Sequence, residues 1–155
     1  MSLKRLNVPS CDDEFMMIAG DIRLRSKDPC TQVGAVIVDT EHRILSLGYN
    51  GTPRGMDDND MPWGKDSKDV SKTKYPYVVH AERNAVLNYR GSLKDMRGAT
   101  VYVTLFPCFE CAKELVQVDI GKIVYGAIRL GKETDISMNI LLSANILIEG
   151  NTSYE

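Results

Sequence analysis

The sequence lacks any apolar run long enough to cross a membrane, for which about twenty consecutive residues are needed. Its first stretch, MSLKRLNVPSCDDEF, carries charges but no apolar core of the kind found in a secretory signal. We therefore expect a cytoplasmic protein that does not work at a membrane.

An excess of charge of one sign is also missing. The 19 Lys and Arg residues against 21 Asp and Glu give a formal net charge of -2. Such a chain has no positive field with which to gather a polyanion, so its composition disfavours nucleic acid as a partner. Small anionic ligands stay compatible with it.

Cysteine and histidine are scarce, with four and two residues. Cys11 and Cys30 could pair as a disulfide, contribute to a second metal site, or be buried free thiols. A reducing compartment favours buried thiols. A second metal site would be short of ligands, because His42, the histidine outside the motif described below, lies in a predicted turn.

Neither an internal repeat nor a low-complexity tract interrupts the 155 residues, of which 43% are hydrophobic and 26% charged. This length fits one domain over residues 1–155, which would bury about two thirds of the surface that the unfolded chain exposes. The composition is that of an ordinary globular protein.

Hydrophobic periodicity predicts helices and strands in alternation. Helices are expected at 12–26, 80–89, 107–116 and 135–143, and strands at 33–39, 43–48, 100–106, 123–125 and 146–148. The first two strands form a hairpin. This order predicts an α/β fold in which helices cover both faces of one mixed sheet. A doubly wound dinucleotide-binding fold is the alternative, but no G-x-G-x-x-G turn is present.

A long loop is expected at 51–74, where the composition changes to Gly, Pro, Asp, Lys and Asn and where Trp63, the only tryptophan, lies. Loops of this length inside a compact domain are usually functional, although a disordered surface insertion is the alternative. The loop leads directly into the first of two motifs.

The two motifs are His80-Ala81-Glu82 and Pro107-Cys108-Phe109-Glu110-Cys111. One imidazole and two thiolates suit zinc, and three protein ligands leave the fourth tetrahedral position for water, as in catalytic sites. Pro107 is expected as the first residue of a helix, so that Cys108 and Cys111, three apart, face the same way. His80 is expected to begin the preceding helix, so both positive helix ends would point at the metal.

Other readings of the cysteine pair are weaker. A structural zinc ribbon would need a second Cys-x-x-Cys, which the chain lacks, and a redox pair would need neither His80 nor Glu82. Glu82 is offset from the ligand direction and can lean over the open position. There a carboxylate can accept a proton from the attacking water and deliver it to a ring nitrogen and a leaving amine, which is typically worth about 100-fold to 10,000-fold in rate.

The spacing H-x-E followed by P-C-x-x-C is the signature of zinc deaminases. Further stretches carry a closer resemblance, and these are Arg25 to Pro29, Gln32 to Ala35, Gly48 to Gly51 with Pro53, Thr73 to Tyr77, and Leu105 to Lys113. With them the chain resembles the deoxycytidylate (dCMP) deaminases of the cytidine deaminase superfamily. The resemblance implies a three-layer sandwich with a central five-stranded mixed sheet. It also implies zinc-dependent hydrolysis of dCMP to dUMP and ammonia, which supplies thymidylate synthesis.

The resemblance also implies residue roles. Metal-ligand roles fall to His80, Cys108 and Cys111, and Glu82 takes the proton-shuttle role. The backbone N–H of Ala81 would contact the base.

Substrate contacts outside the two motifs are less specific. Asn50 carries over as a sugar and phosphate contact, for which the alternative is a turn-forming Asn without a ligand, and Ser26 carries over to the phosphate pocket. Many relatives have a Tyr after the fourth strand that closes over the nucleotide, whereas the stretch 126–131 contains no aromatic residue. Arg129 in this stretch is therefore our hypothesis for a phosphate contact, and Arg83 is a second departure from the family. Further candidates, among which the sequence cannot choose, are Arg25, Lys27, Arg54, Lys65, Lys72 and Lys74.

The remaining expectations concern partners. The family implies a homo-oligomer, a hexamer or a dimer, and possible dCTP and dTTP effectors. Two alternatives remain open: a related zinc deaminase that acts on cytidine, cytosine, guanine, dCTP or tRNA adenosine, and a zinc-stabilised regulatory subunit without catalysis.

Overall fold

A five-stranded mixed sheet forms the centre of the protein, as the sequence predicts. The computed structural model describes residues 2–155. The strand order is β2-β1-β3-β4-β5, with bounds β1 Gly34–Val38, β2 Ile44–Tyr49, β3 Thr100–Leu105, β4 Lys122–Ala127 and β5 Leu147–Gly150. β1 pairs antiparallel with both β2 and β3, while β3, β4 and β5 run parallel. The α/β class, the hairpin and the mixed sheet are thus confirmed.

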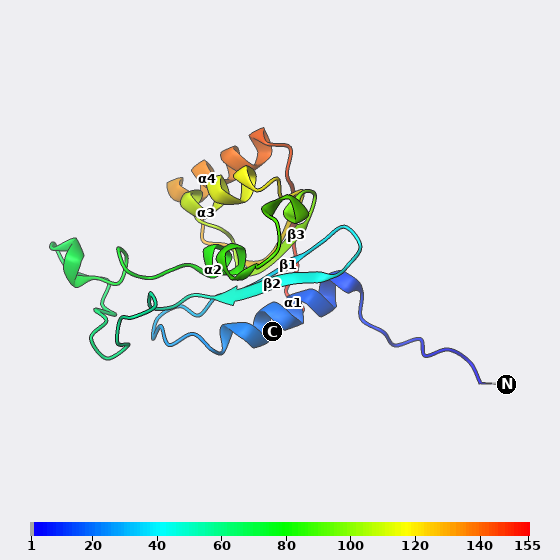
Figure 1. The fold of residues 1–155 in the computed structure, drawn as a ribbon, viewed down its shortest axis with the longest axis horizontal. Coiled ribbons are helices and arrows are strands. Elements are labelled where there is room, and N and C mark those ends of the chain that lie inside the picture. The colour runs from blue at the N-terminus through cyan, green and yellow to red at the C-terminus, as the bar shows by residue number, and fades with distance from the viewer. Residues whose placement is uncertain (1) are drawn as a thin grey trace.

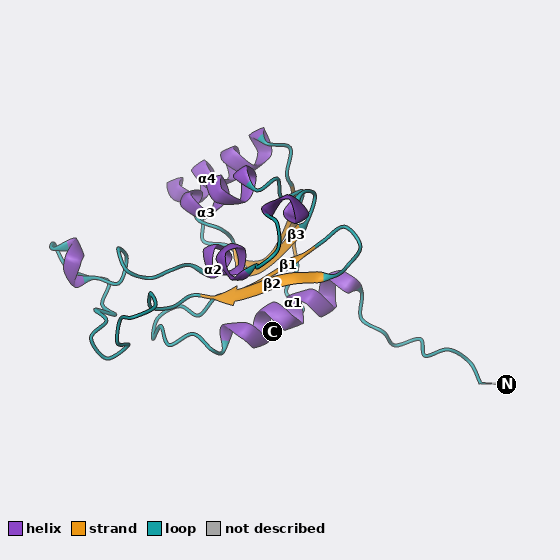
Figure 2. Ribbon diagram, in the orientation of Figure 1, coloured by secondary structure: helices purple, strands orange, loops and turns teal. Residues whose placement is uncertain are grey.

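Helices cover both faces of this sheet (Figure 1). Their bounds are α1 Cys11–Arg23, α2 Ala81–Asn88, α3 Phe109–Gln117 and α4 Lys132–Ser143. α1 lies on one face, and α2, α3 and α4 lie on the other (Figure 2). Alternate residues of β1 feed two separate cores: Ile37 packs with Leu115 and Leu141, while Val36 packs with Met16. The three-layer arrangement is therefore confirmed, and burial on both faces explains why β1 is a continuous apolar run.

Several boundaries differ from the expected ones. α1 ends at Arg23 rather than at Ser26, because backbone N–H groups from Leu24 onward bond to the carbonyl three residues back. Ser26 therefore lies in the loop that follows α1. α4 begins at Lys132, three residues before the predicted start, and two 3-10 turns, Val70–Lys72 and Leu93–Met96, were not predicted.

The two cysteines outside the motif are free, but they are exposed, so the expectation of buried thiols was wrong. Cys11 begins α1 and Cys30 lies in the loop before β1, and both of these side chains are exposed. Within residues 2–155, His80, Cys108 and Cys111 form the one cluster suited to a metal.

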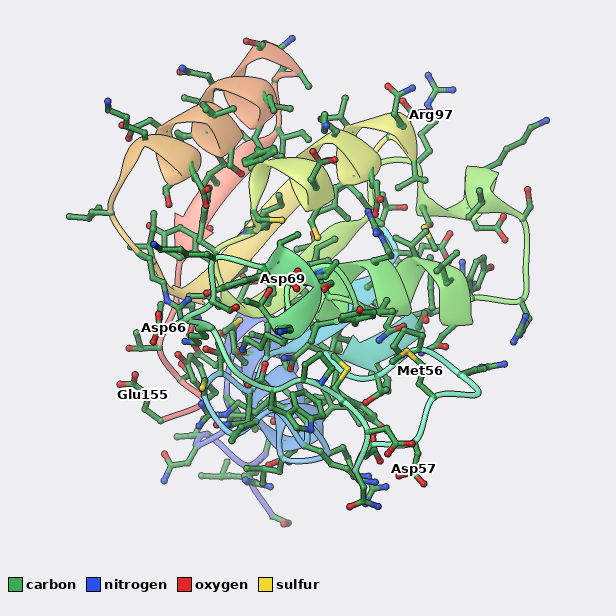
Figure 3. The ribbon with its side chains drawn as sticks, turned by 90° about the vertical axis from the view of Figure 1, so that its left-hand side faces the viewer. Met56, Asp57, Asp66, Asp69, Arg97 and Glu155 are labelled. Carbon is green, nitrogen blue, oxygen red and sulfur yellow. The ribbon has the colours of Figure 1, made fainter. Side chains whose placement is uncertain are left out.

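The long loop runs from the end of β2 to α2, with little regular structure apart from one 3-10 turn. Its two ends meet where the backbones of Gly51 and Val79 exchange hydrogen bonds of 3.0 and 2.9 Å. Figure 3 looks onto this end of the molecule, with Asp69 of the loop labelled near the centre, Asp66 to its left, and Met56 and Asp57, from the earlier part of the loop, at the lower right. The two ends of the loop are thereby held together at one edge of the sheet, while its middle projects beyond the sheet (Figure 1).

The C-terminal segment returns to α1. Tyr154 donates a hydrogen bond to the carbonyl of Thr104 at 3.2 Å and lies under the guanidinium of Arg23, 4.9 Å from the ring centre. A Cβ added at Gly126 would lie 2.1 Å from the ring of Tyr154, and one added at Gly20 would lie 2.6 Å from its Cβ. Two glycines thus make room for one aromatic ring beside the sheet.

No helix within residues 2–155 combines the length and the apolar character needed to span a membrane.

Candidate active site

Two helix N-termini bring the three metal-ligand candidates together. His80 is the N-cap of α2, and Cys108 is the N-cap of α3. The Nδ1 atom of His80 lies 3.4 Å from the Sγ atom of Cys108 and 3.4 Å from that of Cys111. One donor atom from each of the three residues lies within 4.8 Å of the others. The motifs therefore meet in space as the sequence predicts.

The geometry of the cysteine pair differs from the predicted one. Pro107 is not the first helical residue; α3 begins at Phe109, and Cys108 caps it in an extended conformation with φ -69° and ψ 165°. The Cys108 sulfur accepts the backbone N–H of Cys111 at 3.5 Å. Cys108 thus takes the capping role that Ser or Asp usually fills, and capping rather than helical periodicity turns both sulfurs the same way.

Hydrogen-bond contacts link these three side chains. Hydrogen bonds from the Cys111 thiol and from His80, against the opposing effect of burial, lower the pKa of Cys108 to about 4. The hydrogen bond to Cys108, together with burial, raises the pKa of Cys111, and the hydrogen bond to Cys108 also raises the pKa of His80. A thiolate beside a protonated thiol and an imidazole is a site in which a divalent cation can replace the shared proton.

The donor set fits zinc. Two sulfurs and one imidazole nitrogen are ligands that zinc prefers, and a tetrahedral ion would keep one position for water. His80 is exposed and Cys108 is half-buried, whereas Cys111 is buried. The metal would therefore be held from the protein side and remain open on the side of His80 and Cys108.

Glu82 lies in the first turn of α2 with 5% of its surface exposed. Burial raises the pKa of its carboxyl group to about 7. A carboxyl group with such a pKa can both accept and release a proton near neutral pH. Glu82 lines the same cavity as His80 and Cys108, where a proton shuttle would have to lie.

This cavity has a volume of about 280 Å³. Its lining comes from five parts of the chain: the loop before β1, the residue after β2, the long loop with the start of α2, the end of β3 with the segment after it, and the segment after β4 with the start of α4. The lining residues are Asp28, Thr31, Val33, Asn50, Lys65, Lys74, Tyr75, Val78, His80, Ala81, Glu82, Leu105, Phe106, Pro107, Cys108, Arg129, Glu133 and Thr134.

Three of the expected substrate contacts, Asn50, Ala81 and Arg129, line the cavity. The Asn50 amide is held by the protein: its Oδ1 accepts the N–H of Val33 at 2.8 Å, and its Nδ2 donates to the carbonyl of Thr31 at 2.9 Å. Asn50 thus forms part of the cavity wall, and its amide group ties the end of β2 to the loop before β1.

Ser26 and Arg25 do not line this cavity. The Ser26 hydroxyl accepts the backbone N–H of Asp28 at 3.3 Å. Arg25 lines a second cavity of about 290 Å³ together with Lys27, Arg54, Asn84 and Asn88. Arg25 therefore lines a different cavity from the metal-ligand candidates, and Ser26 lines neither of the two.

A buried ion pair in the cavity wall was not expected from the sequence. Lys74 Nζ pairs with the Asp28 carboxylate, and their side chains are 7% and 1% exposed. Asp28 stands in the Arg25 to Pro29 stretch and Lys74 in the Thr73 to Tyr77 stretch, both of which were noted for their resemblance. The position of Asp28 and Lys74 in these two stretches was the only feature of the sequence that could have pointed to the ion pair.

Comparisons with known proteins agree with this geometry. Residues 9–127 match the family described as the cytidine and deoxycytidylate deaminase zinc-binding region. A deoxycytidylate deaminase of Pongo abelii is 47% identical over 111 residues, covering 72% of this chain and 61% of that protein. A deoxycytidylate deaminase of Mycobacterium phage D29 is 33% identical over 126 residues, covering 76% of this chain and 94% of that protein.

A crystal structure of dCMP deaminase from the cyanophage S-TIM5, in complex with dCMP and dUMP, has a TM-score of 0.69 and 25% identity. The similarity covers 93% of this chain and 98% of the cyanophage chain. This chain spans about three fifths of the Pongo abelii, Mus musculus and Homo sapiens relatives that it matches.

Proposed function

We propose, since this chain belongs to the cytidine and deoxycytidylate deaminase family, that it catalyses the zinc-dependent hydrolysis of dCMP to dUMP and ammonia. The observation that carries the proposal is the convergence of His80, Cys108 and Cys111 beside the buried Glu82 on one cavity wall. The names of the relatives supply the substrate, and dUMP would serve thymidylate synthesis.

His80, Cys108 and Cys111 would hold the zinc ion. Zinc, when bound there, supplies Lewis acidity that makes a water molecule a better nucleophile. Glu82 would accept a proton from this water as the water attacks C4 of the pyrimidine. The same carboxyl group would give one proton to the ring nitrogen N3 and pass the next to the amino group, which leaves as ammonia. One water is consumed and the C4 amino group becomes a carbonyl.

The wall around Glu82 would orient the base. Ala81 is the first residue of α2, and the N–H of a first helical residue has no partner within the helix. It can therefore donate to a carbonyl oxygen of the pyrimidine. Asn50, fixed by its own hydrogen bonds, would bound the sugar, and Arg129 would lie near the phosphate.

We further propose that residues 1–155 form a single zinc-dependent nucleotide deaminase domain and that this domain works in the cytoplasm. Both core clusters share one continuous sheet, which supports a single domain.

We also propose a homo-oligomer, either a dimer or a hexamer. An apolar groove between α2 and α3 supports this proposal, because its lining includes Val86, Val118 and Leu87, and Leu87 is 63% exposed. The Arg83–Glu114 ion pair beside the groove offers both signs of charge to a second copy. Sedimentation of a Leu87→Glu variant would test it: a smaller assembly is expected, and an unchanged one would place the contact elsewhere.

dCTP and dTTP remain our proposed effectors. The second cavity supports them, since Arg25, Lys27 and Arg54 line it and its carboxylate, Asp58, is already paired with Lys27. An Arg54→Ala variant should lose any response of the rate to dCTP, and a retained response would exclude this cavity.

The main experiment follows absorbance after zinc-loaded protein is mixed, in parallel, with dCMP, deoxycytidine, cytosine, dCTP and a tRNA stem-loop containing adenosine. We expect turnover of dCMP alone. Turnover of a different substrate would redirect the proposal to a related deaminase, and no turnover with any of them would favour the regulatory-subunit alternative.

A further inference from the structure

We propose that Lys74, Lys65 and Arg129 form the subsite that recognises the 5′-phosphate, in place of Ser26 and Arg25. This inference rests on the proposed function and specifies how that site selects a nucleotide over a nucleoside.

The structure distinguishes among the candidate phosphate-binding cations, among which the sequence could not choose, by the cavity that each one lines. Lys65, Lys74 and Arg129 line the catalytic cavity, together with Glu82 and Cys108. Of the others, Arg25, Lys27 and Arg54 line the second cavity, and Lys72 lines neither. Only the first three can therefore reach a phosphate whose base lies against Glu82.

Lys74 is the buried member of the three. An ammonium group has three N–H donors, and burial of such a group is costly unless its donors are used. Within residues 2–155, Asp28 is the one acceptor that Lys74 Nζ contacts. The side chain is 93% buried yet lines the cavity, so its remaining donors are available to an acceptor that a ligand would bring.

Asp28 fixes this ammonium group in place. Its Oδ1 accepts the backbone N–H groups of Cys30 at 2.8 Å and Thr31 at 3.2 Å. Its Oδ2 accepts Lys74 and, at 3.4 Å, the amide of Asn50. With both oxygens engaged, the carboxylate cannot swing away, and Lys74 is presented to the cavity in one position.

The other two cations supply net charge. Arg129 donates from Nη2 to the hydroxyl of Thr31 at 3.0 Å, which aims the guanidinium at the same wall. In the described part of the chain neither Arg129 nor Lys65 forms an ion pair, whereas Asp28 is neutralised by Lys74. Glu133 is exposed at the rim, where solvent screens its charge. A phosphate with a charge of about -2 at neutral pH would meet two uncompensated cations and the donors of Lys74.

The half-buried Lys65 and the exposed Arg129 are tested first, with Lys65→Ala, Arg129→Ala and the Lys65→Ala/Arg129→Ala double variant. Hydrogen bonds to charged groups are typically worth about tenfold to a hundredfold in binding. We expect kcat/KM for dCMP to fall by about that factor in each single variant, mostly through KM, while kcat/KM for deoxycytidine stays unchanged. Lys68→Ala, an exposed cation of the same loop that lines neither cavity, is the matched control and should change nothing.

Lys74 needs a variant that does not leave Asp28 as a lone buried charge, so Asp28→Asn and Lys74→Met are combined. If Lys74 binds phosphate, the double variant loses dCMP activity selectively. Equal losses of kcat/KM for dCMP and deoxycytidine would show that the Asp28–Lys74 pair only stabilises the cavity wall. Lys74 would then not belong to the subsite.

Calorimetric binding of the product separates failure of this inference from failure of the proposed function. The wild-type protein should bind dUMP more tightly than deoxyuridine, and the Lys65 and Arg129 variants should lose that difference. The subsite is overturned if the wild-type protein shows no preference for dUMP over deoxyuridine, or if that preference survives in the Lys65→Ala/Arg129→Ala variant. This holds even where dCMP turns over normally. Absent turnover with a preserved preference for dUMP would instead overturn the proposed reaction and leave the subsite standing.

Discussion

Replacing Glu82 by Gln should abolish catalysis without loss of the metal or of the fold. The remaining lining carboxylates cannot substitute for it, because Asp28 is bonded to Lys74 and Glu133 is exposed at the rim. Because the same group would carry both proton transfers, the loss in kcat should lie toward the upper end of about 100-fold to 10,000-fold. Four decades correspond to about 5.4 kcal/mol of transition-state stabilisation.

The structure also predicts what this variant keeps. Glu82 is buried and its pKa is raised, so its ionisation opposes folding at neutral pH, and an amide of the same shape should not lower the melting temperature. Steady-state kinetics, elemental analysis and thermal unfolding would be measured together. Glu14→Gln, which also lies in the first turn of a helix but across the sheet, is the control. More than about one hundredth of wild-type activity in Glu82→Gln, or a loss of zinc with the activity, would refute this reasoning.

Three shorter predictions address the metal, the packing and the acid stability. Cys111→Ser should lower the zinc content below one ion per chain by elemental analysis, and retention of stoichiometric zinc would exclude this ligand set. Gly126→Ala should cost roughly 1–3 kcal/mol in chemical unfolding, since its methyl group would meet the Tyr154 ring, and the cost should shrink in a Tyr154→Ala background. Burial opposes ionisation of Asp28, but hydrogen bonds from Lys74 and two backbone N–H groups prevail and lower its pKa. This carboxylate therefore stabilises the fold above its unfolded pKa of about 3.9 and loses that contribution as the pH falls. Wild type should show a steeper loss of stability below that pH than Asp28→Asn, and equal slopes would contradict it.

The metal-ligand candidates could be predicted because each motif is local. His80 precedes Glu82 by two positions, and Cys108 precedes Cys111 by three, so one helix start brings each pair to the site. The sequence did not predict how the two cysteine sulfurs are positioned at the start of α3. Pro107 suggested a helix start, whereas the sulfur of Cys108 caps the helix one residue later.

The cation sites could not be predicted, because they depend on contacts between distant segments. Asp28 and Lys74 are 46 residues apart, and nothing between them indicates that the long loop folds back onto the turn before β1. Ser26 was expected at the phosphate from the resemblance, and Arg25 as one of several candidate cations. In the structure both follow the end of α1, where Arg25 lines the second cavity and Ser26 lines neither.

Sheet topology explains why the distant segments meet. β2 is antiparallel to β1, and β1 is antiparallel to β3, so β2 runs in the same direction as β3 and β4. Asn50, Cys108 and Arg129 each follow one of these strands and consequently lie at the same edge, where α/β proteins usually bind ligands. The metal-ligand candidates are held by helix starts, whereas the proposed phosphate contacts lie in the connecting segments. Substitutions at Lys65 or Arg129 should therefore alter the choice between nucleotide and nucleoside without displacing the metal.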